Sequence, residues 1–515
     1  MSRFDAIVIG GGINGLVAAA VLGRRGRSVC LLERSDRLGG MAGAEGAYPR
    51  MAHLLYNLGP LVRKDIGLGA RDWPFRTVAL PTVALNPGGA HVRIDGTEAR
   101  FVDGRPHPDA AAYRALVTRL GGYGALLRRL AEAPPPGGDA AWTDPAALKQ
   151  MLRLGGFGRA LRQMGKAEMR GFLKVLLSNA YDLILDELPD GPLAGALAAD
   201  AVRGLAMGPR SPGTVFSLVY RHGHGGTVSL PVGGMAAVVA ALAEAARAAG
   251  ATIRTGTAAA RLLCEGDRVI GVETGAGEVL MASRVLSSAA PLATARMAGL
   301  DRFDIEASRR MRLIRARGTV AKINLRLSAL PRIDGLPDDL LGARLLLAPS
   351  AEAVETAFNP AKYRQMSDEP ILEALLPGVT DPAQDAGGAV ALSIIAQYAP
   401  SDLAGGWTDA ARDRLLAAVV GRLAAVAPDL PGLVAGAEVL CPDRIEAETG
   451  APGGHWHHAE LGLDQLLTIR PANGLGHYAM GLAGLYLCGA ATHPGGDVMG
   501  LSGRNAALAA LGDGP

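Results

Sequence analysis

The chain has 515 residues, of which 49% are hydrophobic and 20% charged, so it can bury a large core and is neither disordered nor collagen-like. Fifty-two basic and 49 acidic residues leave a net charge of only +3, which excludes a strongly basic nucleic-acid-binding surface, and no nucleic-acid partner is expected. With roughly one domain per 150 residues, the length predicts two or more domains.

The cysteines and the N-terminus indicate the compartment. Cys30, Cys264, Cys441 and Cys488 form no C-x-x-C pair and do not resemble a disulfide framework, which favours a reducing environment. The N-terminus lacks the regions of a secretory signal, and no run of about 18 apolar residues predicts a membrane-spanning helix. We therefore expect a cytoplasmic protein, with peripheral contact to a membrane left open.

The first 33 residues have the pattern of a strand–helix–strand unit. Residues 4–9, which are apolar apart from Asp5, are typical of a buried parallel strand. A small-residue helix is expected over 13–23, with Gly26 at its end, and a second strand over 28–32. Between the first strand and the helix, glycines recur at the G-x-G-x-x-G spacing of a dinucleotide-binding fold.

Four residues of this unit have separate roles in holding a dinucleotide. Gly10 allows the tight turn, Gly12 lets the backbone approach a pyrophosphate, and Gly15 lets the helix pack closely on the sheet. The helix N-terminus supplies free N–H groups and a partial positive charge for the phosphates. Glu33 ends the second strand and is placed to accept hydrogen bonds from a ribose diol. An ordinary strand–helix–strand unit without a ligand is the alternative.

A second glycine pair indicates which dinucleotide to expect. Gly39 and Gly40 lie in the segment 34–41, where a second loop can approach the cofactor. This segment resembles the extended N-terminal signature of FAD proteins in the amine oxidase and phytoene desaturase superfamily, and the resemblance implies FAD. No second G-x-G-x-x-G follows a strand, so a separate nicotinamide domain is not expected. The cofactor candidates of this unit also include Ile13, Asn14, Arg34 and Met41.

The regions 61–214 and 296–439 contain no motif as sharp as these. The glycine runs 121–124 and 155–158 miss the dinucleotide spacing and are expected to break helices. Helices are expected over 109–131, 145–210 and 408–427, and strands over 313–330 and 388–399.

A middle segment returns to the pattern of the first domain. Residues 230–235 open an alanine-rich helix, which a strand over 251–254 and a hairpin-like region through 264–272 follow. A similar Pro-x-Gly-Gly-Met helix occurs in the family named above, and the strand-like segment 284–291 also resembles that family. The resemblance implies a backbone contact to adenine near Ala259.

The C-terminal segment completes the cofactor pattern. A short apolar strand over 485–488 leads into the glycine-rich run 489–500, and a closing helix is expected from Leu501. This run closely resembles the C-terminal motif of phytoene desaturase-like flavoproteins, in which a second helix N-terminus lies against the flavin. A glycine-rich strand-to-helix turn without a cofactor is the alternative. By position, the cofactor candidates here are Gly489, Asp497, Val498 and Met499.

The resemblance extends to the segments 444–446, 453–460, 463–466 and 470–471. They are similar to bacterial phytoene dehydrogenase-like proteins and to the animal branch called pyridine nucleotide-disulfide oxidoreductase domain-containing protein 2. The implied fold class is α/β, with a Rossmann-like FAD-binding domain of the glutathione reductase type interleaved with an α+β substrate domain that bears a helical lid. The expected FAD domain comprises 1–60, 215–295 and 440–515, and the expected substrate domain comprises 61–214 and 296–439.

The histidine cluster near the C-terminus supplies the catalytic candidates. His455, His457 and Glu460 are the groups that we expect to act if the reaction uses a general acid or base. His455, His457 and His458 form one cluster without a second ligand group at a recognised spacing, so no metal site is expected. A structural role is the alternative for all of them. His53 and Tyr56 are expected either to approach the flavin or to be structural. His222 and His224 are expected to be structural residues of a glycine-rich turn, and His493 is expected to hold the flavin loop.

The resemblance implies an FAD-dependent oxidoreductase that acts on a hydrophobic small molecule, by desaturation of a carbon–carbon bond with hydride transfer to the flavin. The alternatives are an amine-oxidase-like flavoenzyme, a redox-neutral flavin isomerase and a non-catalytic flavin-holding interaction protein. Lys322 lies in an expected strand of the substrate domain and is the residue that would fit the oxygen chemistry of the amine branch. The sequence leaves the substrate, the electron acceptor and the oligomeric state open.

Overall fold

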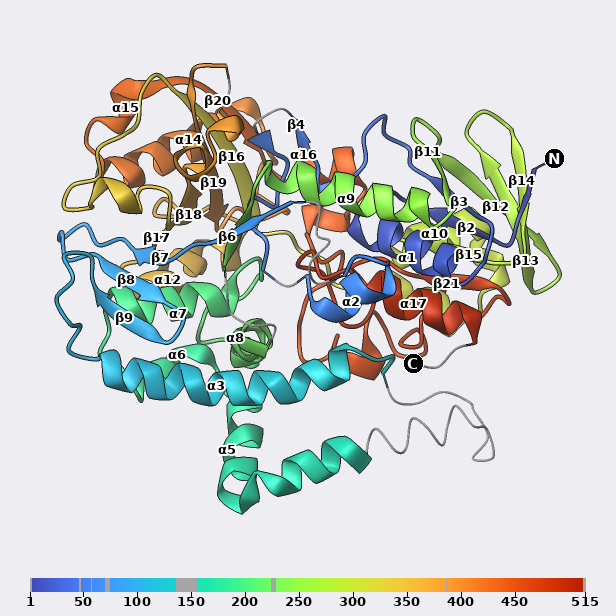
Figure 1. Cartoon of the computed structure of the whole chain (residues 1–515), viewed down its shortest axis with the longest axis horizontal. Helices are drawn as coiled ribbons and strands as arrows, with labels where there is room; N and C mark the ends of the chain where they lie inside the picture. Colours follow the sequence, from blue (N-terminus) through green and yellow to red (C-terminus); the bar gives the residue numbers. More distant parts are fainter. Residues whose placement is uncertain are drawn as a thin grey trace.

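The computed structural model describes residues 2–45, 48–56, 58–69, 75–135, 155–223, 228–385 and 387–512. Two sheets, each covered by helices, lie at opposite ends of the molecule, and the chain passes between them several times (Figure 1).

A five-stranded parallel sheet forms the first end, in the order β11-β3-β2-β15-β21. The residues of its central strands are fully buried, which explains why they are apolar without alternation. The chain continues from β2 to β3 on one side and from β15 to β21 on the other, so the carboxyl ends of β2 and β15 flank a topological switch point, where open α/β sheets bind ligands. The strands are β2 (Ala6–Ile9), β3 (Val29–Leu32), β11 (Thr252–Arg254), β15 (Val285–Ser287) and β21 (Leu485–Leu487).

Helices α1 (Ile13–Arg24), α9 (Gly234–Ala248) and α17 (Leu501–Leu511) pack together beside this sheet (Figure 1). The first and last helices of the fold are therefore neighbours, although α1 ends at Arg24 and α17 begins only at Leu501. A four-stranded sheet and α10 (Pro291–Ala298) complete this end. The sheet consists of β1 (Ser2–Phe4), β14 (Val279–Ala282), β13 (Arg268–Thr274) and β12 (Ala259–Glu265).

An eight-stranded mixed sheet forms the other end, in the order β20-β16-β19-β18-β17-β7-β8-β9. One face is apolar and packs under α14 (Asp409–Ala424), because every second residue of its central strands is aliphatic. The other face of the sheet is directed towards the helices α7 (Pro192–Val202) and α8 (Thr214–Gly223) and carries buried polar side chains. The strands are β7 (Thr82–Ala84), β8 (Val92–Asp95), β9 (Glu98–Phe101), β16 (Val320–Leu327), β17 (Arg344–Leu347), β18 (Ile371–Leu375), β19 (Val390–Gln397) and β20 (Val434–Leu440).

The remaining elements connect the two ends. Helix α3 lies along α8, and α5 projects from the body below them (Figure 1). These elements are α2 (Pro60–Asp65), α3 (Ala110–Ala131), α5 (Gly165–Leu177), α6 (Ala180–Leu185), α11 (Ile305–Arg312), α12 (Ala351–Phe358), α13 (Pro377–Thr380), α15 (Leu430–Leu433), α16 (Pro442–Thr449), β4 (Ala44–Glu45), β5 (Tyr48–Pro49), β6 (Thr77–Ala79) and β10 (Ser229–Pro231).

Two glycine runs are helical where the sequence predicts breaks. Gly121 and Gly122 lie inside α3, and Gly155, Gly156 and Gly158 also lie in helix. A glycine in a helix interior costs only about 1 kcal/mol, and the buried face that α3 presents to α8 outweighs this cost. The prediction that these runs break helices is wrong.

The structure also differs from the expected first strand and from the expected place of His222. The expected strand 4–9 is interrupted at Asp5, and the residues before it pair with β14 of the four-stranded sheet instead. His222 lies in the last turn of α8 rather than in a turn, and His224 lies outside the described residues. In the described part of the chain, no helix combines the length and the hydropathy that crossing a bilayer requires.

Candidate functional site

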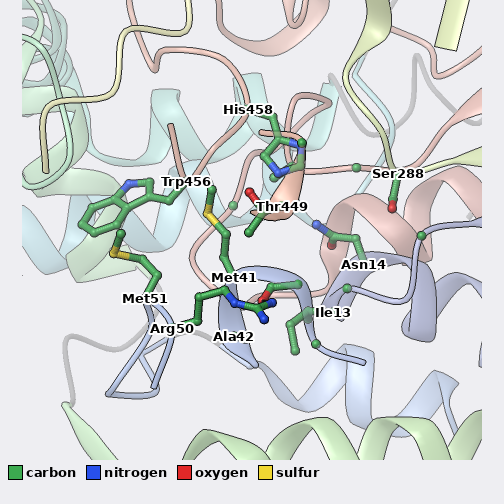
Figure 2. A pocket seen from close by; sticks show the side chains of 18 of the residues that line it. Ile13, Asn14, Met41, Ala42, Arg50, Met51, Ser288, Thr449, Trp456 and His458 are labelled. Atoms are coloured by element: carbon green, nitrogen blue, oxygen red, sulfur yellow. The ribbon is translucent and has the colours of Figure 1, made fainter. Parts of the chain in front are cut away.

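A cavity of about 370 Å³ lies at the carboxyl ends of the parallel strands. Its walls come from the turn after each of β2, β3, β15 and β21, and from the segments that follow α16 and α7. Trp456 and Met51 lie at one end of it, Asn14 and Ser288 at the other, and Met41 between them (Figure 2). The cofactor candidates that line this cavity are Gly10, Gly12, Ile13, Asn14, Glu33, Arg34, Gly39, Gly40, Met41, Ala259, Gly489, Asp497 and Val498.

Two cofactor candidates lie behind the wall of the cavity. A Cβ on Gly15 would lie 1.9 Å from the carbonyl oxygen of Gly10, so this glycine is required for the close packing of α1 on the turn after β2. Met499 is buried, and its Sδ accepts a hydrogen bond of 3.3 Å from the Tyr220 hydroxyl. Neither residue lines the cavity: Gly15 packs against the turn that does, and Met499 is bonded to Tyr220 behind the wall.

The first turn of α1 forms the floor of the cavity. Gly12 precedes the helix with extended backbone angles, and a Cβ there would meet no protein atom within 4 Å. The amides of this first turn have no carbonyl partners within the helix, and the helix dipole adds partial positive charge. Gly12 therefore leaves room for a phosphate group at the helix N-terminus.

The N-terminus of α17 lies against the same turn. The amide of Gly503 donates a hydrogen bond of 3.3 Å to Asn14 Oδ1, and a Cβ on Gly503 would lie 1.9 Å from the Asn14 carbonyl oxygen. Two helix N-termini from the two ends of the chain thus meet at one place, which is the arrangement that an extended dinucleotide requires.

Glu33 lies at the end of β3 in the cavity wall. Its carboxylate accepts hydrogen bonds from the amides of Gly11 at 2.6 Å and Ser35 at 2.9 Å. These bonds fix the carboxylate beside the glycine turn. Free lone pairs remain on it for a ribose diol.

Glu33→Ala is expected to weaken FAD binding by about 1.5 kcal/mol, or roughly tenfold in Kd, because a charge-assisted hydrogen bond to the ribose is lost. Titration of the apoprotein with FAD measures this effect. The control is Glu278→Ala, which removes the exposed partner of Arg254 away from the cavity and should leave Kd unchanged. A Glu33→Ala protein with wild-type affinity would show that the ribose contact is misplaced.

The glycine-pair loop is held by the end of α16. Arg34 Nη2 donates hydrogen bonds to the carbonyl oxygens of Ala447 at 3.1 Å and Glu448 at 2.7 Å, and Arg50 forms an ion pair of 3.1 Å with Glu448. Cations are stabilised at a helix C-terminus, so these contacts close one side of the cavity.

The C-terminal motif carries unusual backbone angles. Asp497 and Val498 line the cavity with φ values of 68° and 62°, a region that β-branched residues rarely adopt. Strain of this kind is found where the surrounding structure forces the backbone towards a ligand. Ser288 supports the same motif, because a Cβ on Gly489 would lie 2.3 Å from its carbonyl oxygen.

The three catalytic candidates lie outside the cavity wall. His455 and His457 are buried, and each uses its Nδ1 to accept a backbone amide hydrogen bond, from His457 and Gly496 respectively. Glu460 forms ion pairs with Arg317 at 2.9 Å and Arg315 at 3.3 Å. Burial raises the pKa of Glu460, but Arg317 holds it below its usual value. None of the three side chains lines the cavity, and their catalytic role stays a prediction.

His458 lines the cavity instead (Figure 2). Burial, and then the charge of Arg470, lower the pKa of His458 to about 4, so its ring is neutral at pH 7. Among the described residues, His458 Nδ1 and the indole nitrogen of Trp456 are buried without a hydrogen-bond partner. Two unpaired polar groups in the wall fit a site that is completed by a polar ligand.

Arg470 holds the histidine segment against the C-terminal motif. Its guanidinium is fully buried and donates to six carbonyl oxygens, which belong to residues 457, 459, 460, 465, 490 and 492. Burial lowers the pKa of Arg470 to about 10, so it stays protonated at pH 7. His493 is a structural group, since its Nε2 lies 2.9 Å from the Leu130 carbonyl oxygen.

A buried polar network covers the cavity from the side of the eight-stranded sheet. Lys322 Nζ lies 2.6 Å from Ser393 Oγ and 3.1 Å from His53 Nδ1, and His53 Nε2 lies 2.9 Å from Glu373. Burial and the neighbouring Lys322 lower the pKa of His53 to about 3. The Tyr56 hydroxyl donates to Glu373 at 3.1 Å. Of these residues Tyr56 lines the cavity, whereas Lys322 and His53 lie behind the wall.

Sequence reasoning did not single out several residues of the cavity wall. Arg203 lies at the end of α7, and no local pattern distinguishes it from the other arginines of the chain. Trp456 could have been found from its place within the segment that resembles the family. The further wall residues that were missed include Arg50, Met51, Leu54, Ser288, Ile395 and Thr449.

Two family models match the chain: an NAD(P)-binding Rossmann-like domain over residues 8–61 and a flavin-containing amine oxidoreductase over residues 176–511. The second covers well over half of the chain. The chain belongs to the flavin-containing amine oxidoreductase family. The cavity fits this assignment through its glycine floor and paired helix N-termini, so this member of the family is an FAD-dependent oxidoreductase.

Curated proteins are similar to this chain over nearly its whole length. Pyridine nucleotide-disulfide oxidoreductase domain-containing protein 2 of Rattus norvegicus is 31% identical, over 98% of this chain and 93% of the relative. An uncharacterized protein of Mycobacterium tuberculosis is 29% identical over 99% and 97%. The four cysteines of this chain are free, so none of them forms a disulfide.

Solved structures show the same fold. A putrescine oxidase variant has a TM-score of 0.59 at 13% identity, covering 99% of each chain. Cyclohexylamine oxidase from Brevibacterium oxydans has a TM-score of 0.56 at 15% identity, covering 99% of this chain and 98% of that one. In the described ranges no group of three histidine, cysteine or acidic side chains is arranged to hold a metal ion.

Proposed function

We propose that this enzyme dehydrogenates a carbon–carbon bond of a hydrophobic substrate that is neutral or anionic, rather than oxidising a cationic amine. Bound FAD supplies the two-electron acceptor for such a reaction. The observation that supports the proposal is the place of Arg203 in the cavity wall, between two aromatic rings.

The guanidinium of Arg203 lies over the faces of two aromatic rings. A substrate ammonium group would bind to such faces by cation–π contact, so Arg203 occupies its place. Its guanidinium carbon lies 4.8 Å from the ring centre of Tyr56 and 4.7 Å from that of Trp456. Gly204 makes this stacking possible, because it has a φ of 75° and a Cβ there would lie 2.0 Å from the Trp456 ring. A second cation about 4 Å from Arg203 would meet a repulsion of at most about 4 kcal/mol at an effective dielectric constant of 20, because Glu373 compensates part of the charge.

Arg203 is held in place by Glu373, which it contacts through two hydrogen bonds of 2.7 and 3.2 Å. Its charge favours substrates that carry or develop negative charge when a proton leaves carbon. Met51, Leu54 and Ile395 contribute apolar wall beside it, which suits a hydrophobic chain.

The test is an anaerobic titration of the purified holoenzyme, with the visible flavin absorbance as the readout. We expect bleaching by isoprenoid hydrocarbons or long-chain carboxylic acids, and no bleaching by primary or secondary amines of equal chain length. Free FAD under the same conditions is the control for non-enzymatic reduction. Bleaching by amines alone, or by none of these compounds, contradicts the proposal.

A further inference from the structure

A second cavity, of about 310 Å³, lies between the polar face of the eight-stranded sheet and the helices α3, α7 and α8. Tyr56 lines both this cavity and the flavin cavity, so the two are separated by little more than one ring. Much of the second cavity is apolar, with Leu80, Ile94, Leu197 and Leu218 in its wall. Its shape and lining suit an organic molecule rather than a lone ion.

Ion pairs connect five charged side chains beside this cavity. Asp200 pairs with Arg344 at 2.5 Å and with Arg221 at 3.0 Å. Glu373 pairs with Arg344 and with Arg203, each at 2.7 Å. Three guanidinium groups therefore share two carboxylates, and the cluster carries one positive charge in excess.

The neighbouring groups do not balance this charge, because Asp95, the further acidic residue in the cavity wall, is itself paired with Arg93 and Arg100. Lys322 and His53, which contact the same network, are bases and cannot become negative. Asp497, whose charge also acts on Arg203, lies in the wall of the flavin cavity and not in that of the second cavity. An uncompensated buried cation is unfavourable, so the cluster is a place where an anion would bind.

Arg221 is the member of the cluster best placed to meet a ligand. It lies in the last turn of α8, lines the second cavity, and stacks on Tyr56 with its guanidinium carbon 4.8 Å from the ring centre. Its Nη1 is buried 3.0 Å from Asp200 Oδ1, in ion-pair contact but without the angles of a hydrogen bond. A guanidinium has five N–H donors, so Arg221 can donate to a ligand in the cavity while it keeps the ion pair with Asp200.

We propose that the second cavity binds the carboxylate group of a hydrophobic substrate, and that Arg221 is the side chain that recognises it. This inference rests on the proposed function, whose substrate class it narrows to apolar carboxylic acids. One carboxylate matches the single excess charge, and a guanidinium fork matches its geometry. The apolar chain of the substrate then extends past Tyr56 towards the flavin cavity.

The experiment measures the binding of octanoate to the oxidised holoenzyme by isothermal titration calorimetry, with 1-octanol and octylamine as comparison ligands. We expect octanoate to bind at least about tenfold more tightly than either, and Arg221→Gln to weaken octanoate binding at least about tenfold. Arg210→Gln is the matched control. It removes an exposed arginine outside the cavity and should leave octanoate binding unchanged.

Thermal unfolding of the same variants shows whether the fold is preserved. Arg221→Gln balances the cluster at two guanidinium groups and two carboxylates, so its melting temperature should equal or exceed that of the wild type. Equal binding of octanoate and 1-octanol, or undiminished octanoate binding by Arg221→Gln, overturns the inference. The comparison of ligands and variants reports binding, whereas the bleaching test reports flavin reduction, so the failure of one proposal can be told from the failure of the other. Bleaching by amines together with Arg221-dependent octanoate binding would contradict the proposed function alone.

Discussion

Gly12→Ala is expected to yield a folded protein that has lost most of its affinity for FAD. The added methyl group meets no protein atom within 4 Å, and Gly12 has a φ of −72° that alanine adopts freely. The stability of the apoprotein should therefore change by no more than about 1 kcal/mol. The methyl group fills the space where a phosphate approaches the first turn of α1. Losing charge-assisted hydrogen bonds of about 1.5–3 kcal/mol each should raise the Kd for FAD by a factor of about 100 or more.

The measurement combines a titration of the apoprotein with FAD and a denaturant unfolding curve. Gly15→Ala is the matched comparison, because the same methyl group there would lie 1.9 Å from the Gly10 carbonyl oxygen. This variant should lose about 3 kcal/mol of unfolding free energy or fail to fold. A Gly12→Ala protein that purifies with a full complement of flavin would contradict the role given to this turn.

Glu373→Gln is expected to lower the free energy of unfolding by about 3–5 kcal/mol. The carboxylate is 5% exposed and compensates both Arg203 and Arg344, while it also accepts the Tyr56 hydroxyl. Glutamine keeps the shape of the side chain but leaves two guanidinium groups buried with one fewer anion. Equilibrium urea unfolding at pH 7 measures the loss.

The pH dependence of this difference follows from the pKa of Glu373. Burial raises this pKa, but the charges of Arg203 and Arg344 hold it well below its usual value of 4.5 in the folded protein. The stabilisation is thus fully present above the unfolded-state pKa, and it is lost as the pH falls through the lower folded-state pKa. The gap between wild type and Glu373→Gln should begin to narrow as the pH falls below about 4.5 and should close below the folded-state pKa.

Glu369→Gln is the control for this variant. Its carboxylate is 75% exposed and lies 3.8 Å from Arg422, so the change should stay within about 0.5 kcal/mol. A Glu373→Gln protein as stable as Glu369→Gln would mean that the buried network contributes no net stability.

The sequence by itself determined the dinucleotide-binding unit and its cofactor class. The apolar run before Gly10, the glycine spacing and the acidic end of β3 are consecutive in the chain, so local pattern is sufficient to recognise them. The C-terminal motif was recognisable for the same reason. The family assignment agrees with both, and 13 of the 15 cofactor candidates line one cavity, although their individual contacts with FAD remain predictions.

Only the tertiary structure decided which charged groups meet beside the flavin cavity. Glu373 lies on β18, Arg344 on β17 and Lys322 on β16. Glu373 and Arg344 are each the one polar residue of an apolar strand, whereas β16 also carries Asn324 and Arg326. Their side chains meet because alternate residues of neighbouring strands face the same side of the sheet, and the pairing of those strands is not encoded locally. The choice between His457 and His458 as the cavity residue has the same origin. Adjacent residues of a loop point in different directions, and here the buried Arg470, which no local pattern links to the loop, holds it in place.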